Sequence, residues 1–374
     1  MTPLFFGSEI YRGSSYGHWH PLRVPRVSTT MDLCRAMGWL PRSQFQTSPR
    51  AKPSALSAWH DPDYLSALVE AEETQSLSEA ARKRFHIGTP SNPIFPEVYR
   101  RPATGAGASL AAGELLRNPG IIYHPGGGTH HGMPARANGF CYLNDCVLAI
   151  QSLRRSGLTR IAYIDIDAHH PDGVVHAYGN DPDTLLISVH EAGRWPRTGA
   201  LTDHGMGTQV NLPVPAGLND TEFEALRDAV ILPWVQAFRP EAIVLQCGAD
   251  AVTEDPQSRL ALSNNAHWSM VRAVMALTDR LLVLGGGGYN PWSVGRLWSG
   301  VWATLNGYEI PETLPEAGQC VLRDLTWERG PSLRPFDPPP DWTNTLRDPA
   351  RPGPMRDATR AVMAHHAARR LALT

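Results

Sequence analysis

Cysteine is scarce in this chain. The sequence contains five cysteines, an odd number with no CxxC pair: Cys34, Cys141, Cys146, Cys247 and Cys320. This spacing argues against a disulfide framework and against a structural zinc site built from cysteine thiolates. We therefore expect reduced and mostly buried thiols.

An excess of charge of either sign is also lacking. The chain has 34 Lys and Arg against 36 Asp and Glu, for a formal net charge of −2. Without a large basic face, we predict no direct nucleic-acid binding and a small or peptide-like partner instead. No apolar run is long enough to span a bilayer, and residues 1–10 show no signal-peptide pattern. We expect a cytoplasmic protein without membrane association, whose oligomeric state stays open.

What the sequence does contain is a repeated order of strand, loop and helix. Short apolar runs predict buried strands at residues 121–123, 161–166, 185–189, 242–246 and 281–284. Helices are expected at residues 29–37 with Ser28 as the N-cap, 64–74 after Asp61, 103–116, 144–153, 221–237 and 264–278. This alternation predicts one α/β domain with a parallel multi-stranded sheet and helices on both faces.

The composition changes after Gly330, where prolines become frequent. We expect a main domain of residues 1–330 and an extension of residues 331–374, consisting of an extended proline-rich segment and a terminal helix at about 355–371 that packs on the same domain. Arg356, Arg360, Arg369 and Arg370 are expected to form the solvated face of that helix.

Polar clusters follow the predicted strands. They are His130 and His131, Asp165 to Asp172, His190, Asp250, and the glycine-rich Gly285 to Asn290. Because ligands of such sheets bind at the carboxyl ends of the strands, we expect these clusters to form one site. Side chains two apart on an extended strand share a face, so Asp165, Asp167 and His169 are predicted to point into one pocket.

The residue types at this edge are those of a catalytic metal. Asp167, His169 and Asp250 supply three ligands and leave a position for water, the pattern of catalytic zinc; ferrous iron or cobalt would also suit. His131 or His130 is a candidate general base, with Asp165 and Asp172 as partners that fix the histidine tautomers.

Tyr289 follows four glycines, Gly285 to Gly288. No GxGxxG pattern leads into a helix there, so we do not interpret this stretch as a phosphate loop. One interpretation is that the glycines bring the Tyr289 hydroxyl over the metal as an oxyanion donor. The alternative, a buried tyrosine after a turn, stays open.

Five segments together resemble the zinc-dependent histone deacetylase family, and within it the bacterial acetoin-utilisation-type deacetylases. They are GGGTHHG (126–132), NGFCYLND (138–145), YIDIDAHHPDG (163–173), GADAVTEDP (248–256) and LGGGGYN (284–290), within residues 20–306. The resemblance implies an arginase-deacetylase fold, with a deacetylase catalytic domain over residues 1–330. It also implies zinc-dependent hydrolysis of an N-acetyl-lysine or similar acylated amine.

By position, the resemblance implies a role for each site residue. Asp167, His169 and Asp250 are similar to the ligands of one zinc ion, His131 to the general base and acid, and His130 to its electrostatic neighbour. Tyr289 is similar to the carbonyl-polarising residue, and Asp165 and Asp172 to the histidine partners. Asp165, Asp167, His169, Ser188 and Val189 resemble a structural potassium site. Gly139, Phe140, Trp195 and the rim residue Gln257 resemble the substrate tunnel, and Arg26 the acetate channel.

Some positions depart from the family pattern. Pro171 replaces a usual glycine and fixes φ near the metal loop, residues 85–95 contain no rim aspartate, and residues 198–211 form a shortened segment. Peptide substrates are therefore in doubt, and an acetylpolyamine or another small amide is the alternative. An arginase-like dimanganese hydrolase and a non-catalytic binding module are the remaining alternatives.

Overall fold

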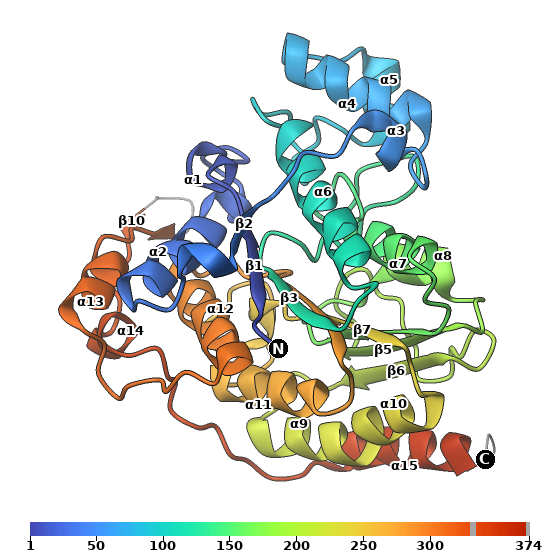
Figure 1. The fold of residues 1–374 in the computed structure, drawn as a ribbon, viewed down its shortest axis with the longest axis vertical. Coiled ribbons are helices and arrows are strands. Elements are labelled where there is room, and N and C mark those ends of the chain that lie inside the picture. Colours follow the sequence, from blue (N-terminus) through green and yellow to red (C-terminus); the bar gives the residue numbers. More distant parts are fainter. Residues whose placement is uncertain (330–333, 372–374) are drawn as a thin grey trace.

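The computed structural model describes residues 1–329 and 334–371. Its centre is an eight-stranded parallel sheet with the strand order β2-β1-β3-β8-β7-β4-β5-β6 (Figure 1). The strands are β1 (Leu4–Gly7), β2 (Phe45–Thr47), β3 (Gly120–His124), β4 (Ile161–Asp165), β5 (Thr184–Glu191), β6 (Gln209–Val214), β7 (Ala242–Gln246) and β8 (Arg280–Leu284). The predicted parallel α/β architecture is confirmed.

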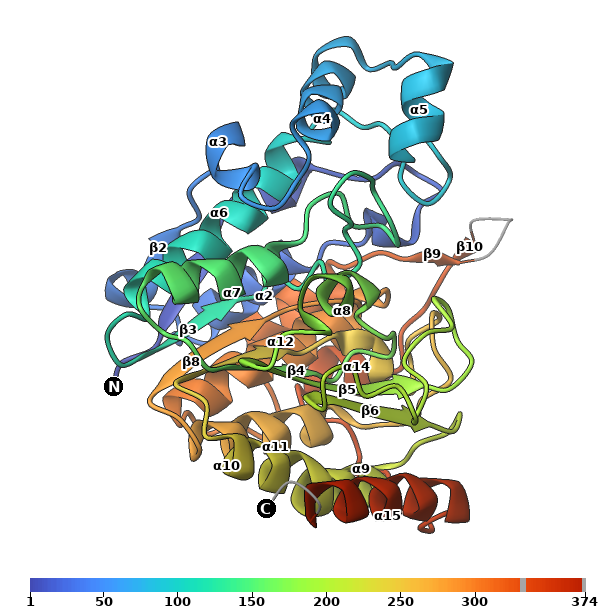
Figure 2. The same ribbon diagram turned by 90° about the vertical axis from the view of Figure 1, so that its right-hand side faces the viewer.

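The α-helices that surround the sheet are α1 (Ile10–Gly13), α2 (Val27–Ala36), α3 (Pro53–Leu56), α4 (Pro62–Thr74), α5 (Glu79–Phe85), α6 (Arg100–Leu115), α7 (Asp145–Arg155), α8 (Asp172–Tyr178), α9 (Asp220–Leu226), α10 (Leu232–Phe238), α11 (Asn264–Met275), α12 (Pro291–Asn306), α13 (Glu316–Arg323), α14 (Pro340–Asn344) and α15 (Asp357–Leu371). Helices α6 and α7 lie over one face of the sheet, and α9, α10, α11 and α15 lie on the other side (Figure 2). Helices α3, α4 and α5 project beyond the end of the sheet (Figure 1). In the described part of the chain, no helix combines the length and apolar character that crossing a membrane requires.

Alternating side chains of the strands build a separate hydrophobic core on each face. In β4, Ile161 and Tyr163 pack into the core under α6 and α7, whereas Ala162 and Ile164 pack into the core that includes α11 and α12. This is the period of two expected for an extended strand. Because both faces are covered, β4 is buried along its whole length and shows no polar alternation before its last residue, Asp165.

Three strands of the sheet were not predicted, β1, β2 and β6. Strands β2 and β6 lie at the edges of the sheet and β1 lies next to β2, and β6 contains Pro213, which cannot donate a backbone hydrogen bond to a neighbouring strand. Edge strands need fewer apolar residues than central strands, so a search for continuous apolar runs does not identify them.

Two predictions about the helices are wrong. Helix α2 begins at Val27, so Ser28 lies inside it and is not the N-cap. The predicted helix at 221–237 is interrupted by a π-helical segment, Arg227–Ile231, between α9 and α10. Pro233 at the start of α10 lacks the backbone N–H that a continuous α-helix would use. This accounts for the irregular backbone hydrogen bonding in the segment before it.

The terminal helix α15 packs on α9 and β6. The Arg356 guanidinium makes an ion pair with the buried carboxylate of Glu222, and Arg369 donates to the backbone carbonyls of Gln209 and Gly207. The prediction of a solvated arginine face is therefore wrong for these two residues. Arg360 is largely exposed, as predicted, and the side chain of Arg370 lies outside the described residues.

Candidate active site

The polar residues lie at the carboxyl ends of four adjacent strands of the sheet. In spatial order they are β3, β8, β7 and β4. The loop after β3 carries His130 and His131, the loop after β4 carries Asp167 and His169, a short 3-10 turn after β7 carries Asp250, and the glycine-rich loop after β8 leads to Tyr289. Residues distant in the sequence converge because these strands are parallel neighbours.

Asp167, His169 and Asp250 form the tightest group of candidate metal ligands. One ligand atom from each lies within 4.8 Å of the others, and among the described residues this is the one group of three or more acidic, histidine or cysteine side chains so arranged. Nδ1 of His169 is 2.9 Å from Oδ2 of Asp250 and 3.1 Å from Oδ1 of Asp167. Strand β4 ends at Asp165, so Asp167 and His169 lie in the following loop and not on the strand as predicted.

The two carboxylates are oriented by neighbouring amides. The backbone N–H of Gly287 donates to Oδ2 of Asp167 at 2.7 Å, and the Gln246 side-chain amide donates to the same oxygen at 3.1 Å. The backbone N–H of Ala168 donates to Oδ1 of Asp250 at 3.0 Å. Gln246, the last residue of β7, was not among the predicted site residues, although a polar residue closing an apolar strand was the available signal.

Glycines around the carboxylates are required by space. A Cβ atom on Gly287 would lie 2.1 Å from Oδ2 of Asp250, and one on Gly248 would lie 2.1 Å from Oδ2 of Asp167. The glycine-rich loop therefore allows its backbone to touch the acidic centre directly.

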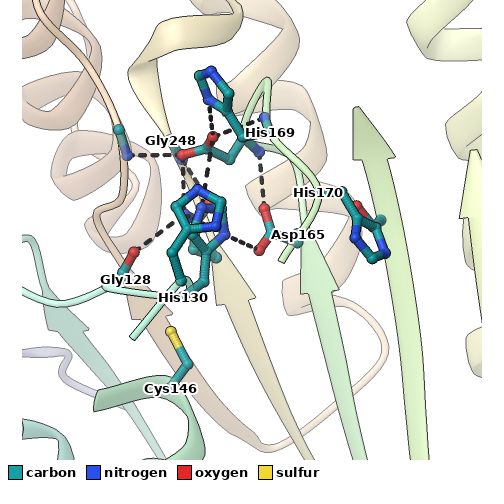
Figure 3. A network of polar contacts seen from close by, with 12 residues as sticks. Gly128, His130, Cys146, Asp165, His169, His170 and Gly248 are labelled. Atoms are coloured by element: carbon teal, nitrogen blue, oxygen red, sulfur yellow. Dashed lines mark hydrogen bonds and ion pairs between the residues drawn. The ribbon is translucent and has the colours of Figure 1, made fainter. Parts of the chain in front are cut away.

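The tandem histidines each contact a different aspartate, and Figure 3 shows the contact between His130 and Asp165. Nδ1 of His130 lies 2.8 Å from Oδ2 of Asp165, and Nδ1 of His131 lies 2.7 Å from Oδ1 of Asp172. The Asn138 side-chain amide donates to the second oxygen of Asp172 at 2.9 Å. The two predicted histidine–aspartate pairs are thus present, with Asn138 as an additional partner.

The two histidines differ in their affinity for a proton. Burial, followed by the charge of His130, lowers the pKa of His131 to about 3. Burial also disfavours the charged form of His130, but the carboxylates of Asp165 and Asp167 outweigh it and raise its pKa to about 9. At neutral pH this arrangement holds His131 uncharged, with its Nε2 atom free of the contact to Asp172.

Tyr289 is buried, 8% exposed, and lines the cavity described next. Its backbone N–H donates to Oδ2 of Asp255 at 2.6 Å, and its ring meets the Phe140 ring edge-on at 5.9 Å. Burial raises the pKa of the Tyr289 hydroxyl well above its usual value, so it remains a proton donor. Asp255 was not predicted, because it acts through a backbone contact that sequence does not reveal.

A cavity of about 720 Å³ opens over this centre. Its walls include His131, His169 and Tyr289 together with all four residues predicted for the tunnel, Gly139, Phe140, Trp195 and Gln257. A Cβ atom on Gly139 would lie 2.3 Å from the Trp195 ring, so the passage is narrow there. Phe140 has φ of 69°, a left-handed conformation uncommon for a bulky residue and typical of functional sites.

Arg26 lies on a second, smaller cavity of about 40 Å³ behind the first. Both cavities are lined by His131, His169 and Tyr289. The Arg26 guanidinium donates to the carbonyl of Gly286 at 2.6 Å and stacks over Trp298, while its buried Nε has no partner among the described residues.

His170 and His190 do not join this centre. His170 points away from His169 (Figure 3) and contacts the Thr198 hydroxyl and the Asn211 side chain. His190 packs against His170 and contacts the carbonyl of Gly199. The expectation that all five strand-end clusters would form one site is therefore wrong for His190.

The residues predicted for the potassium site include Ser188 and Val189 on β5, the strand next to β4. Asp165 pairs with Ser188 across β4 and β5, which places the loop after Asp165 beside Ser188 and Val189.

Pro171 has φ of −78°, an angle that proline adopts without strain, and its carbonyl accepts the N–H of Val175 at the start of α8. Proline is thus compatible with the loop at this position.

Comparison with known proteins agrees with this geometry. The family model described as "Histone deacetylase domain" matches residues 20–305. The chain is 34% identical to "Putative histone deacetylase 2" of Caenorhabditis elegans, over 80% of this chain and 61% of that protein. It is 33% identical to "Histone deacetylase 1" of Homo sapiens, over 80% of this chain and 64% of that protein. The chain thus spans about three fifths of the length of these relatives.

The overall structure is similar to that of an HDAC homologue from Aquifex aeolicus. The TM-score is 0.92 at 32% identity, over 98% of this chain and 100% of that chain. The same values are found for an HDAC homologue complexed with SAHA. The family model covers more than half of the sequence and the fold agrees along almost the whole chain, so this protein belongs to the histone deacetylase family and has its α/β fold.

Proposed function

We propose that this protein is a zinc-dependent deacetylase that hydrolyses the N-acyl amide of a lysine or a related amine. The observation that carries the proposal is the grouping of Asp167, His169 and Asp250 together with the His131–Asp172 pair, because His131 and His169 both line one cavity. The similarity to an HDAC homologue complexed with SAHA supports a substrate similar to acylated lysine.

The donor set fits a zinc ion. Nδ1 of His169 faces two carboxylate oxygens at 2.9 and 3.1 Å, so a proton or a metal cation is needed between these groups. One nitrogen and two oxygen ligands that face a cavity match a catalytic site with an open position. A zinc ion bound there would supply a Lewis acid for the amide carbonyl and for the attacking water.

The chain's own residues would then move the protons. Asp172 holds Nδ1 of His131, so Nε2 of His131 accepts a proton from the attacking water and later donates it to the leaving amine. His130, held by Asp165, would act as the electrostatic neighbour of His131, since the centroids of the two rings lie 4.0 Å apart. The protonated hydroxyl of Tyr289 donates to the oxyanion that forms from the carbonyl.

The remaining predicted residues would bind the substrate, the product and a structural ion. Gly139, Phe140, Trp195 and Gln257 would hold the acyl-amine stem, and Arg26 would attract the carboxylate product into the inner cavity. A potassium ion bound by Asp165, Asp167, His169, Ser188 and Val189 would stabilise the loop after β4. We also propose that residues 1–330 form the catalytic domain, that residues 331–374 extend it, and that the protein acts in the cytoplasm without a membrane or nucleic-acid partner.

Acetate release from acetyl-lysine peptides and from acetylpolyamines by the zinc-loaded protein tests the proposal. We expect hydrolysis of at least one class, abolished in His131→Ala and Asp250→Ala and retained in the exposed controls His176→Ala and Asp324→Asn. Equal activity in His131→Ala and the wild type would reject the mechanism. Two manganese ions per chain instead of one zinc would favour an arginase-like hydrolase, and no release from any substrate would favour a binding module.

A further inference from the structure

The mouth of the cavity carries more positive than negative charge. Three arginines line it, Arg194, Arg197 and Arg259, but only one acidic residue, Glu191. The carboxylate of Glu191 is 7% exposed and is occupied by Arg194, whose Nη2 lies 3.0 Å from Oε1. The backbone N–H of Arg259 donates to Oε2 of Glu191 at 2.7 Å. Glu191 therefore neutralises Arg194 and fixes the loop that carries Arg259.

The acidic residues that follow Asp250 do not compensate for this charge. Glu254 makes an ion pair with Arg351, and Asp255 is 5% exposed and accepts the backbone N–H groups of Gln257 and Tyr289. The lining residues that precede β3 also include no carboxylate; they are His86, Thr89, Ser91 and Asn92.

Arg197 and Arg259 are thus left with a free charge. Both side chains are exposed, both line the cavity, and neither makes an ion pair or side-chain hydrogen bond with any residue in the described ranges. Arg197 also has φ of 64°, in the left-handed region, where its N–H donates to the carbonyl of Arg194 at 2.7 Å. An uncommon backbone conformation next to Trp195 thus helps to hold a cation at the rim.

We propose that Arg197 and Arg259 form an anion-binding subsite at the mouth, and that the substrate is an acylated amine that also carries a carboxylate. This inference rests on the proposed function and specifies its substrate class. Guanidinium groups recognise carboxylates through charge-assisted hydrogen bonds. A cationic acylpolyamine would be repelled by the same two groups, which argues against the acetylpolyamine alternative.

Two substrates that differ in a single charge test the subsite. Nα,Nε-diacetyl-lysine has a free carboxylate, and its C-terminal carboxamide is neutral; N-acetylputrescine serves as the cationic comparison. Values of kcat/KM are measured with the zinc-loaded protein, and Kd values are measured by calorimetry with the metal-free protein. The variants are Arg197→Gln, Arg259→Gln and the double variant. The control is Arg117→Gln, an exposed arginine just before β3, at the opposite edge of the sheet.

We expect the carboxylate compound to be preferred by at least about fivefold in both measurements, since exposed ion pairs are worth up to about 1 kcal/mol each. The preference should fall below about twofold in the double variant, persist in Arg117→Gln, and weaken with added salt. Equal Kd values for acid and amide in the wild type, or a preference that survives the double substitution, would overturn the subsite. Preferential binding of the carboxylate compound without acetate release would support the subsite and contradict the proposed hydrolysis. Acetate release without a preference for the carboxylate compound would contradict the subsite and support the hydrolysis.

Discussion

Nδ1 of His131 lies 2.7 Å from Oδ1 of Asp172, the first residue of α8. The same oxygen accepts the backbone N–H of Gly173, and Asn138 occupies the other oxygen. The orientation of the proposed base is thus set by a helix that makes no other contribution to the metal centre. A change in Asp172 should affect proton transfer while leaving zinc binding intact.

For Asp172→Asn we expect kcat to fall by about 10- to 100-fold, the range found for partners that orient active-site histidines. Zinc content measured by atomic absorption should stay at the wild-type value, because Asp172 is not in the group of Asp167, His169 and Asp250. Asp324→Asn, an exposed carboxylate, is the control. A loss of zinc in Asp172→Asn would assign Asp172 to the metal site instead.

Gly287→Ala should weaken zinc binding. The added Cβ would lie 2.1 Å from Oδ2 of Asp250 and 2.9 Å from Oδ2 of Asp167, so the carboxylates or the loop must move. We expect the zinc affinity from chelator competition to fall by at least about tenfold, comparable to the loss of an orienting partner. At Gly13 an added Cβ meets nothing within 4 Å, so Gly13→Ala is the matched control. Unchanged affinity in Gly287→Ala would show that the close approach is not needed.

Zinc should stabilise the folded protein, since its three proposed ligands come from two strand ends that are brought together only by folding. Free zinc at about 1,000 times its Kd adds about 4 kcal/mol to the free energy of unfolding. Calorimetry should therefore show a Tm that rises with zinc and falls with a chelator. The shift should vanish in Asp250→Ala, and its persistence there would place the stabilising ion elsewhere.

The attachment of α15 should depend on pH through Glu222. Burial alone would raise the pKa of Glu222, but hydrogen bonds from Arg356 and Thr359 outweigh it and hold that pKa below its usual value. Because the pKa is lower in the folded state, the contribution is complete above the unfolded value of about 4.3 and is lost as the pH falls through the folded pKa.

Glu222→Gln should therefore lower the free energy of unfolding at pH 7 by about 2 kcal/mol, since it removes charge-assisted hydrogen bonds from a buried group. Its stability should also change less than that of the wild type as the pH falls below about 4. Glu224→Gln, an exposed neighbour on α9, should show neither effect in urea titrations. Equal pH profiles for Glu222→Gln and the wild type would contradict the assignment.

The central strands and the grouping of the three candidate metal ligands could be predicted from sequence because two simple rules apply to them. Strands covered on both faces are apolar up to their last residue, as in β4 and β7, and neighbouring parallel strands have their carboxyl ends on the same side of the sheet. Asp167, His169 and Asp250 follow directly from these rules together with the family resemblance.

Other features depend on contacts that no local pattern records. Gln246 and Asp255 act by hydrogen bonds to the Asp167 carboxylate and the Tyr289 backbone, and their partners lie far along the chain. Arg356 appeared to belong to a polar helix face, yet its partner Glu222 is 134 positions away. The apolar run at 185–189 suggested that His190 follows the strand, but β5 continues to Glu191, so His190 lies within it and contacts the carbonyl of Gly199.

Strand β8 is the last strand of the sheet in sequence, yet it lies between β3 and β7. A nascent chain that has not yet produced β8 already contains Asp167, His169 and Asp250. Without β8, however, no strand connects β3, which leads to His130 and His131, with β7 and β4, which lead to the three candidate ligands. Such non-local pairing is slow to form and leaves strand edges open until it is complete. We therefore expect His130 and His131 to stay apart from the proposed metal ligands until β8 is in place, and a fragment that ends before Arg280 should contain all three ligands after the paired strands β4 and β7 without the two histidines beside them.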